Sequence, residues 1–187
     1  MRGEALALIE LRSLARGLRC LDALVKKAPV EVLEANLVEP GKHLLLFAGG
    51  VAEVDEAFRE AVSVGGEDVV DRMILFDAHP ALLQGLRGVE DIRTADEMDC
   101  LGVVEIDTVA RALSCCDRSL KNADVTLAGL RVAGGLGGRA YYVVFGAQHD
   151  VEAALEIAEG RRELIPRPHD EMIPWLLRPA PFSVGGA

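Results

Sequence analysis

Residues 10–33, ELRSLARGLRCLDALVKKAPVEVL, return in altered form as residues 105–128, EIDTVARALSCCDRSLKNADVTLA. At a constant shift of 95 positions the two stretches share nine identities, where ordinary residue frequencies would supply roughly two. The match resumes after a two-residue insertion, with pairs such as Gly41/Gly138 and Val54/Val151. A duplicated unit of about 90 residues is a domain, so the sequence predicts two tandem domains.

The apolar residues change their spacing in the same order within each copy. The first copy predicts strands at 5–11, 30–38, 42–49 and 72–76. It also predicts three helices, of which the first begins after Ser13 and ends at Lys26 and Lys27, and the others cover 54–65 and 80–86. The second copy predicts strands at 101–106, 125–132, 139–145 and 164–165, with helices at 108–122, 151–159 and 171–176. The order β-α-β-β-α-β is that of a ferredoxin-like fold, an α+β class in which helices and a sheet form an α/β sandwich.

The predicted domain organisation follows from the repeat and from one acidic segment. We expect a first domain at 1–88, a linker at 89–99, a second domain at 100–178 and a flexible tail at 179–187. The segment between the copies is rich in Asp and Glu, and a charge run of this kind is usually solvated.

Composition excludes several classes of function. The formal net charge of −10 argues against nucleic acid as the main partner, because neutralising phosphates needs a basic face. It also disfavours adsorption to an anionic membrane, and the longest apolar runs fall far short of the ~20 residues that cross a bilayer. Acidic residues near the start make a poor secretory signal, so we expect a cytosolic protein. The four cysteines show no C-x-x-C spacing and are expected to be buried, reduced thiols.

The residues that could carry catalysis are mostly present in both copies. His79 and His169 each follow the last predicted strand of their copy, and Glu10/Glu105 and Asp22/Asp117 are equivalent pairs. One active site needs only one set of groups, so duplication favours structural roles, with the glutamates bonded to nearby backbone amides. No histidine stands at a metal-binding spacing, and we expect neither an enzyme nor a metal site.

Two glycine-containing loops occupy the same place in the two copies. The first is Glu39, Pro40 and Gly41, and the second includes Gly135, Leu136, Gly137 and Gly138. A phosphate-binding loop needs a helix N-terminus after it, whereas a strand follows here in each case. Neither loop is therefore a nucleotide motif by itself.

Together these residues resemble bacterial microcompartment shell proteins. The similarity is carried by residues 22–30 (DALVKKAPV) with 117–125 (DRSLKNADV), by 40–43 (PGKH) with 136–139 (LGGR), and by 165–169 (IPRPH). It covers the chain from about residue 5 to 177, and the duplication resembles the trimeric, tandem-domain class. The resemblance implies a structural, non-enzymatic protein of the compartment shell in the cytoplasm. It further implies a flat homotrimer of six similar domains, a pseudohexamer that tiles with hexameric and pentameric shell proteins and encloses enzymes.

The resemblance also assigns roles to particular residues. Lys26 and Lys121, each in the last turn of a helix, would contact neighbouring tiles, although a solvated helix-end lysine is the simple alternative. Arg167 resembles the family's edge-contacting arginine and His169 belongs to the same motif, while the first copy has Asp77 at the corresponding place. The two glycine loops would line a central pore for metabolites, in which three copies of Glu39 form an acidic collar. A plain turn with Glu39 in solvent is the alternative.

One branch of this class, the tandem shell proteins of propanediol-utilising compartments, carries a cysteine in the first loop, where three chains hold an iron–sulfur cluster. Glu39 stands at that position here, so the resemblance implies no such cluster and no other cofactor. A different function remains open beside the shell protein. Two ferredoxin-like domains could hold a small molecule between them, as a ligand-binding or regulatory protein does.

Overall fold

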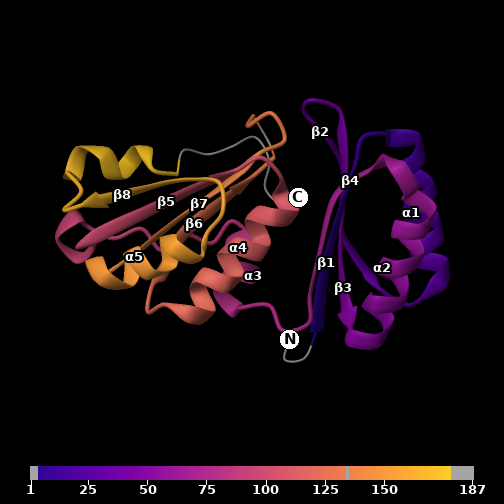
Figure 1. The fold of residues 1–187 in the computed structure, drawn as a ribbon, viewed down its shortest axis with the longest axis horizontal. Helices are drawn as coiled ribbons and strands as arrows, with labels where there is room; N and C mark the ends of the chain where they lie inside the picture. The colour runs from indigo at the N-terminus through magenta and orange to yellow at the C-terminus, as the bar shows by residue number, and fades with distance from the viewer. Residues whose placement is uncertain (1–3, 134, 178–187) are drawn as a thin grey trace. The chain divides into compact units, whose positions relative to one another are not determined.

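The computed structural model describes residues 4–133 and 135–177. The chain divides after Ala78 into two compact units. Each unit contains a four-stranded antiparallel sheet with two α-helices on one face (Figure 1).

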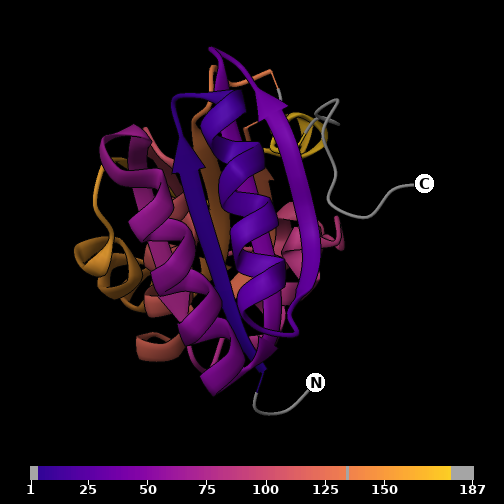
Figure 2. The same ribbon diagram turned by 90° about the vertical axis from the view of Figure 1, so that its right-hand side faces the viewer.

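The first unit follows the predicted order of elements. Its strands are β1 (Glu4–Leu11), β2 (Glu31–Val38), β3 (Lys42–Gly50) and β4 (Val69–Leu75), its helices are α1 (Leu14–Lys27) and α2 (Val51–Gly65), and the short 3-10 helix η1 spans Gly66–Asp68. The sheet order is β2-β3-β1-β4. Figure 2 shows α1 and α2 side by side across one face of this sheet.

The side chains on that face of the sheet form a core with the two helices. Ile9 on β1 and Phe47 on β3 point to the helices and form a core with Leu24 and Ala57. Because successive side chains of a strand point to opposite faces, Glu10 lies on the other face of the sheet. Ser13 begins α1 as predicted, since its hydroxyl accepts the Arg16 backbone N–H at 3.2 Å.

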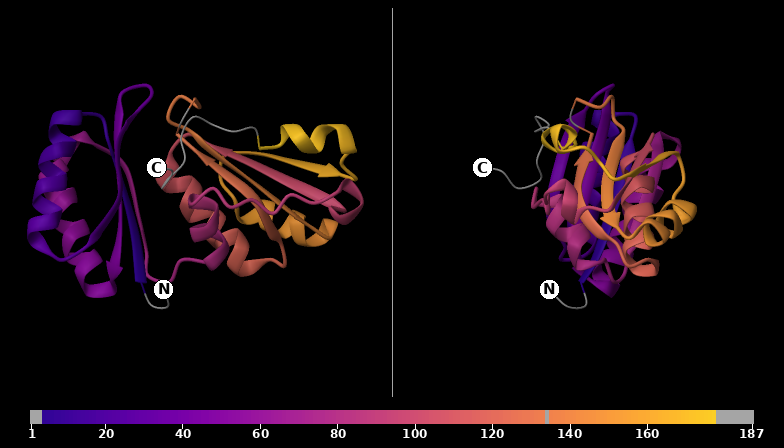
Figure 3. Two further views of the ribbon diagram at one scale, coloured as in Figure 1. Left: turned by 180° about the vertical axis from the view of Figure 1, so that it is seen from behind. Right: turned by 90° about the vertical axis from the view of Figure 1, so that its left-hand side faces the viewer.

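The second unit repeats this plan. It contains α3 (Pro80–Leu86), η2 (Ala95–Glu97), β5 (Cys100–Ile106), α4 (Val109–Asn122), β6 (Thr126–Val132), β7 (Ala140–Gly146), α5 (Gln148–Ile157), β8 (Arg161–Pro166) and η3 (Asp170–Trp175). The sheet order β6-β7-β5-β8 is equivalent to that of the first unit. In Figure 3 (left) η3 lies on the sheet face opposite α4 and α5, where Ile173 packs with Leu101 and Val143. The predicted ferredoxin-like order is confirmed in both copies.

The division between the units differs from the predicted boundary at residue 88. Helix α3 packs on α4 and β6 of the second unit, where a Cβ on Gly85 would lie 3.0 Å from Leu127 Cδ2. The expected solvated linker at 89–99 is also packed on that unit. The Asp91 N–H donates to the Ala128 carbonyl at 3.0 Å, and Met98 is fully buried. These few contacts could not be predicted from the acidic composition of the segment.

The predicted tail at 179–187 lies outside the described residues. Within the described ranges, no helix has the length and apolar character needed to cross a bilayer.

Candidate functional site

The first predicted pore loop is a tight connection between β2 and β3. Glu39, Pro40 and Gly41 are all exposed, and the Glu39–Pro40 peptide bond is cis. The Gly41 N–H donates to the Val38 carbonyl at 2.8 Å. Gly41 has a φ of 104°, so a side chain there would be strained although a Cβ would meet no atom within 4 Å.

The second loop connects β6 and β7 at the equivalent place. The Leu136 N–H donates to the Ala133 carbonyl at 3.2 Å, and the Arg139 N–H donates to the Leu136 carbonyl at 3.3 Å. Gly137 and Gly138 have φ values of 60° and 75°. The loop is uneven in exposure, because Gly135 and Gly137 are exposed while Leu136 is half-buried and Gly138 is buried.

A duplicated ion pair lies at the base of each loop. Lys42 Nζ lies 3.1 Å from a carboxylate oxygen of the fully buried Glu10, and Arg139 Nη1 lies 2.8 Å from a carboxylate oxygen of Glu105. The sequence predicted backbone amides as partners of these glutamates. The structure shows a basic side chain beside each of them, and the signal was present, since Lys42 and Arg139 are themselves equivalent positions. Each pair joins the first strand of a sheet to the strand that leaves the loop.

A cavity of about 450 Å³ adjoins the second loop. Its wall includes Leu136 from the loop, Tyr141 from β7 and the paired Arg139 and Glu105. Burial raises the pKa of the Tyr141 phenol, and its hydroxyl donates to the Leu176 carbonyl at 3.3 Å. The charged residues among the described lining, Arg139 and Glu105, are paired with one another.

The two predicted edge lysines occur in the same local arrangement. Lys26 Nζ lies 2.7 Å from Asp22 Oδ2, and Lys121 Nζ lies 2.7 Å from Asp117 Oδ2. Both lysines are exposed at the C-terminal end of their helices, where a cation interacts favourably with the helix dipole. The carboxylates differ, because the Asp22 side chain is 60% exposed and the Asp117 side chain only 4%.

The motif that contains Arg167 and His169 forms the turn after β8. Arg167 is exposed, with a φ of 49°, and its N–H donates to the Asp99 carbonyl at 2.8 Å. His169 Nδ1 accepts the Glu171 N–H at 3.2 Å, and His79 Nδ1 accepts the Ala81 N–H at the same distance. The imidazoles thus cap the helices that follow them, a contact that both copies share.

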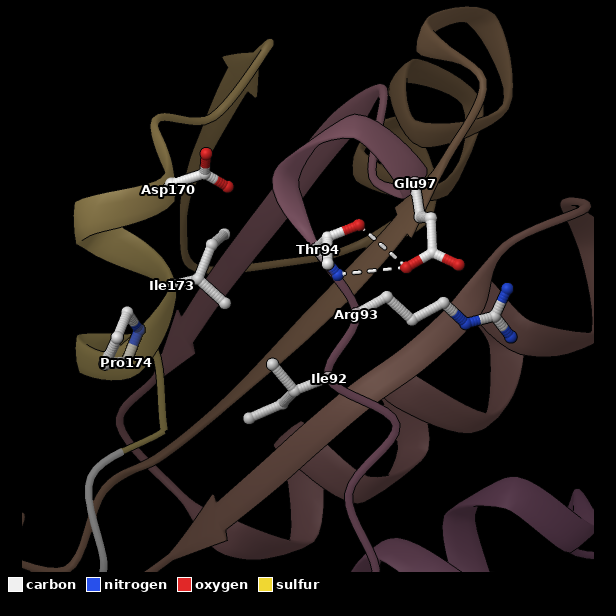
Figure 4. A pocket seen from close by; sticks show the side chains of 7 residues that line it. All are labelled: Ile92, Arg93, Thr94, Glu97, Asp170, Ile173 and Pro174. Atoms are coloured by element: carbon white, nitrogen blue, oxygen red, sulfur yellow. Dashed lines mark hydrogen bonds between the residues drawn. The ribbon is translucent and has the colours of Figure 1, made fainter.

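A second cavity of about 460 Å³ lies beside η3 (Figure 4). Its charged groups are engaged locally: Glu97 accepts from the Thr94 hydroxyl at 2.8 Å, and Arg93 pairs with Asp91 at 2.9 Å. The N–H of Ala95 also donates to Asp170 Oδ1 at 3.3 Å. The last of these contacts joins the segment before β5 to η3, and the cavity lies within the second unit.

The cysteines lie in the protein interior and form no cluster that could bind a metal among the described residues. All four cysteines are buried and free, and burial raises the pKa of the Cys20, Cys100 and Cys116 thiols. Among residues 4–133 and 135–177, no three His, Cys, Asp or Glu side chains converge as metal ligands. Cys20 is a fully buried core residue on α1 and is not part of the loop at Glu39.

Comparison with known proteins places these features in one family. The family model described as "BMC domain" matches residues 5–77 and again residues 100–166. The bacterial microcompartment shell protein PduT of Citrobacter freundii is 34% identical over 178 residues, which cover 90% of this chain and 95% of that protein.

Two solved structures have a similar fold. A microcompartment protein from Desulfitobacterium hafniense DCB matches with a TM-score of 0.76 and 29% identity, over 90% of this chain and 97% of that one. The fused permuted hexameric shell protein of the RMM microcompartment matches with a TM-score of 0.60 and 20% identity, over 82% and 81% of the two chains, which supports the fold alone. With two domain matches in tandem, this chain belongs to the BMC-domain family of bacterial microcompartment shell proteins.

Proposed function

We propose that this protein is a structural tile of a bacterial microcompartment shell, in which three chains form a closed ring of six BMC domains with a central pore. The proposal rests on the tandem BMC domains and on near full-length similarity to a shell protein. One observation carries it: the two glycine loops leave equivalent strands of two equivalent sheets, each over a buried or half-buried ion pair. Six such loops can surround one axis only if both copies alternate around a threefold ring.

The loop composition predicts the character of the pore. Glu39 is exposed at the tip of the first loop, whereas Leu136 holds the equivalent position in the second. Three chains would therefore contribute three carboxylates and three leucines. A ring of carboxylates favours cations and neutral polar metabolites over anions.

Selectivity through the trimer tests the pore assignment. The reversal potential of trimers in a planar bilayer, measured across a potassium chloride gradient, should indicate cation preference in the wild type and a weaker preference in Glu39→Gln. Glu31→Gln is the matched control, because Glu31 is an exposed glutamate at the other end of β2. Equal selectivity in all three proteins would rule out Glu39 as the collar.

The edge residues form the second part of the proposal. Lys26 and Lys121 would reach neighbouring tiles from both kinds of edge, with Arg167 and His169 exposed on the second kind only. Lys26→Gln, which adds no negative charge beside Asp22, should weaken sheet formation seen by electron microscopy, while the mass remains three times the 20.0 kDa of one chain. Lys27→Gln is the control, because this neighbouring exposed lysine has no counterpart in the second copy. Lys121→Gln is less clean, because it would also remove the basic partner of the buried Asp117.

Catalysis and cofactor binding are not part of the proposed function. The BMC-domain family is structural, and the loop at Glu39 offers a carboxylate rather than a thiolate. We therefore expect an anaerobically purified trimer to be colourless. Stoichiometric iron with visible absorbance would contradict that expectation and would assign the pore a redox role.

A further inference from the structure

The second unit contains a partly buried junction between the start of α3 and the C-terminal half of α4. The backbone N–H of His79 donates to Asp117 Oδ1 at 2.7 Å, while Lys121 lies against the other oxygen of the same carboxylate. Helix α3 follows β4 of the first unit after a few residues and packs here on α4 and β6. The junction therefore joins the segment that ends one copy of the repeat to the face of the next copy.

The duplication provides both halves of this junction a second time. His169 caps η3 with the geometry that His79 shows at α3, and Asp22 holds Lys26 as Asp117 holds Lys121. In the second set the two halves belong to different units, Asp22 to the first and His169 to the second. Within residues 4–133 and 135–177, neither the N–H of His169 nor Asp22 Oδ1 makes a hydrogen bond. Asp22 is exposed, whereas Asp117 is buried.

The apolar residues around the two carboxylates show the same contrast. Leu120 on α4 and Leu127 on β6, which line one pocket with His79, are buried. Their equivalents at a shift of 95 are Val25 and Val32, and both are exposed. An apolar surface retained in both copies but covered in only one indicates a missing partner for the other.

The end of the second copy carries residues that fit this uncovered surface. Trp175 of η3 stands six residues after His169, as Gly85 of α3 stands six residues after His79. Gly85 lies against Leu127, whereas Trp175 is exposed and the position equivalent to Leu127 holds the smaller Val32. Inside the chain the small Gly85 faces the larger Leu127. Between chains the large Trp175 would face the smaller Val32.

We infer that Asp22, with Val25 and Val32, is the docking site for the His169 turn and η3 of a second copy of this chain. The His169 N–H donates to Asp22 across the interface, as the His79 N–H donates to Asp117 within the chain. Each molecule then receives one neighbour at α1 and offers its own η3 to the next, so the contact is heterologous and closes into a ring. This inference rests on the proposed ring of three chains and names the contact that closes it.

Paired cysteines test the contact directly. Asp22→Cys with His169→Cys, oxidised under native conditions, should give covalent dimers and trimers on a non-reducing denaturing gel, and neither single variant should do so. The native cysteines are buried and will not compete. The internal pair, His79→Cys with Asp117→Cys, is the geometric control and should close within one chain.

A dissociation measurement gives an independent result if a cysteine variant fails to fold. Asp22→Ala should raise the concentration at which trimers dissociate by about tenfold or more, because it removes a charged hydrogen-bond acceptor from each interface. Asp55→Ala is the matched control: Asp55 forms an exposed i,i+4 pair with Arg59 on α2 of the same unit and should leave dissociation unchanged. Mass photometry over a dilution series measures both variants.

The outcomes separate this contact from the proposed function. A wild-type trimer without intermolecular cross-links, and with Asp22→Ala behaving as Asp55→Ala does, would overturn the docking site and leave the shell tile standing. A wild-type monomer at all concentrations would overturn both.

Discussion

The imidazole of His43 occupies the space that a side chain on Gly17 would need. A Cβ built on Gly17 would lie 2.8 Å from His43 Cγ and closer still to Nδ1. His43 is buried between β3 and α1, and its Nδ1 has no hydrogen-bond partner among the described residues. The second copy has Ala112 and Ala140 at the two equivalent positions, both fully buried. One copy therefore uses a glycine and a histidine where the other uses two alanines.

This exchange predicts strong coupling between the two positions. Gly17→Ala alone should cost about 2–3 kcal/mol of unfolding free energy by overpacking, and His43→Ala alone about 2 kcal/mol by leaving a cavity. The double variant should cost less than the sum by at least about 1 kcal/mol, because it recreates the alanine pair of the second copy. Urea unfolding at one fixed protein concentration measures the cycle. Additive costs would show that His43 and Gly17 do not share this space.

The buried imidazole also predicts a pH dependence of stability. Burial lowers the pKa of His43 below its ordinary value of 6.5, although a hydrogen bond with the Ala35 backbone opposes the shift. As the pH falls below about 6.5 the unfolded chain takes up a proton that the folded chain refuses, so stability decreases until the folded pKa is reached. Between pH 7.5 and 5.5 the wild type should lose more unfolding free energy than the Gly17→Ala, His43→Ala variant. Equal losses would mean that another group controls the acid limb.

The two ion pairs below the loops should differ in their contribution to stability. Lys42→Met leaves the carboxylate of Glu10 buried and should cost about 3 kcal/mol. Arg139→Met acts on a pair whose side chains are 47% and 40% exposed, and should cost less than about 1 kcal/mol. Thermal unfolding of the two variants compares them. A cost for Arg139→Met as large as that for Lys42→Met would contradict the difference in burial.

The cysteines should resist modification in the folded protein. All four are fully buried, and burial raises the pKa of three of the thiols, so few thiolates are available as nucleophiles near neutral pH. A thiol reagent should label almost none of them within minutes in native buffer and all four after denaturation in guanidinium chloride. Rapid labelling of any cysteine under native conditions would indicate local opening of that helix or strand.

The element order could be predicted because it depends on local signals. Ser13 caps α1 and short, nearly continuous apolar runs mark β1 and β3, and these patterns recur 95 or 97 positions later. The duplicated loops at Gly41 and Gly138 were found for the same reason. Their role in a pore came from family resemblance and remains a proposal.

The packing of the connecting segment could not be predicted in this way. Residues 89–99 look solvated by composition, yet Met98 is buried and Asp91 bonds to β6, because a few contacts can anchor an acidic segment. The partners of Glu10 and Glu105 were likewise missed, since the pairing of β1 with β3 and of β5 with β7 brings distant charges together.

The sequence by itself determined that the chain contains two copies of one βαββαβ domain, because repetition and apolar spacing are properties of the linear order. Only the tertiary structure decided that Asp117 is buried under the start of α3 while its twin Asp22 is exposed. The physical reason is that burial depends on which segment covers a residue. Two nearly identical helices therefore acquire different surroundings when the segment that follows the first copy packs on the second.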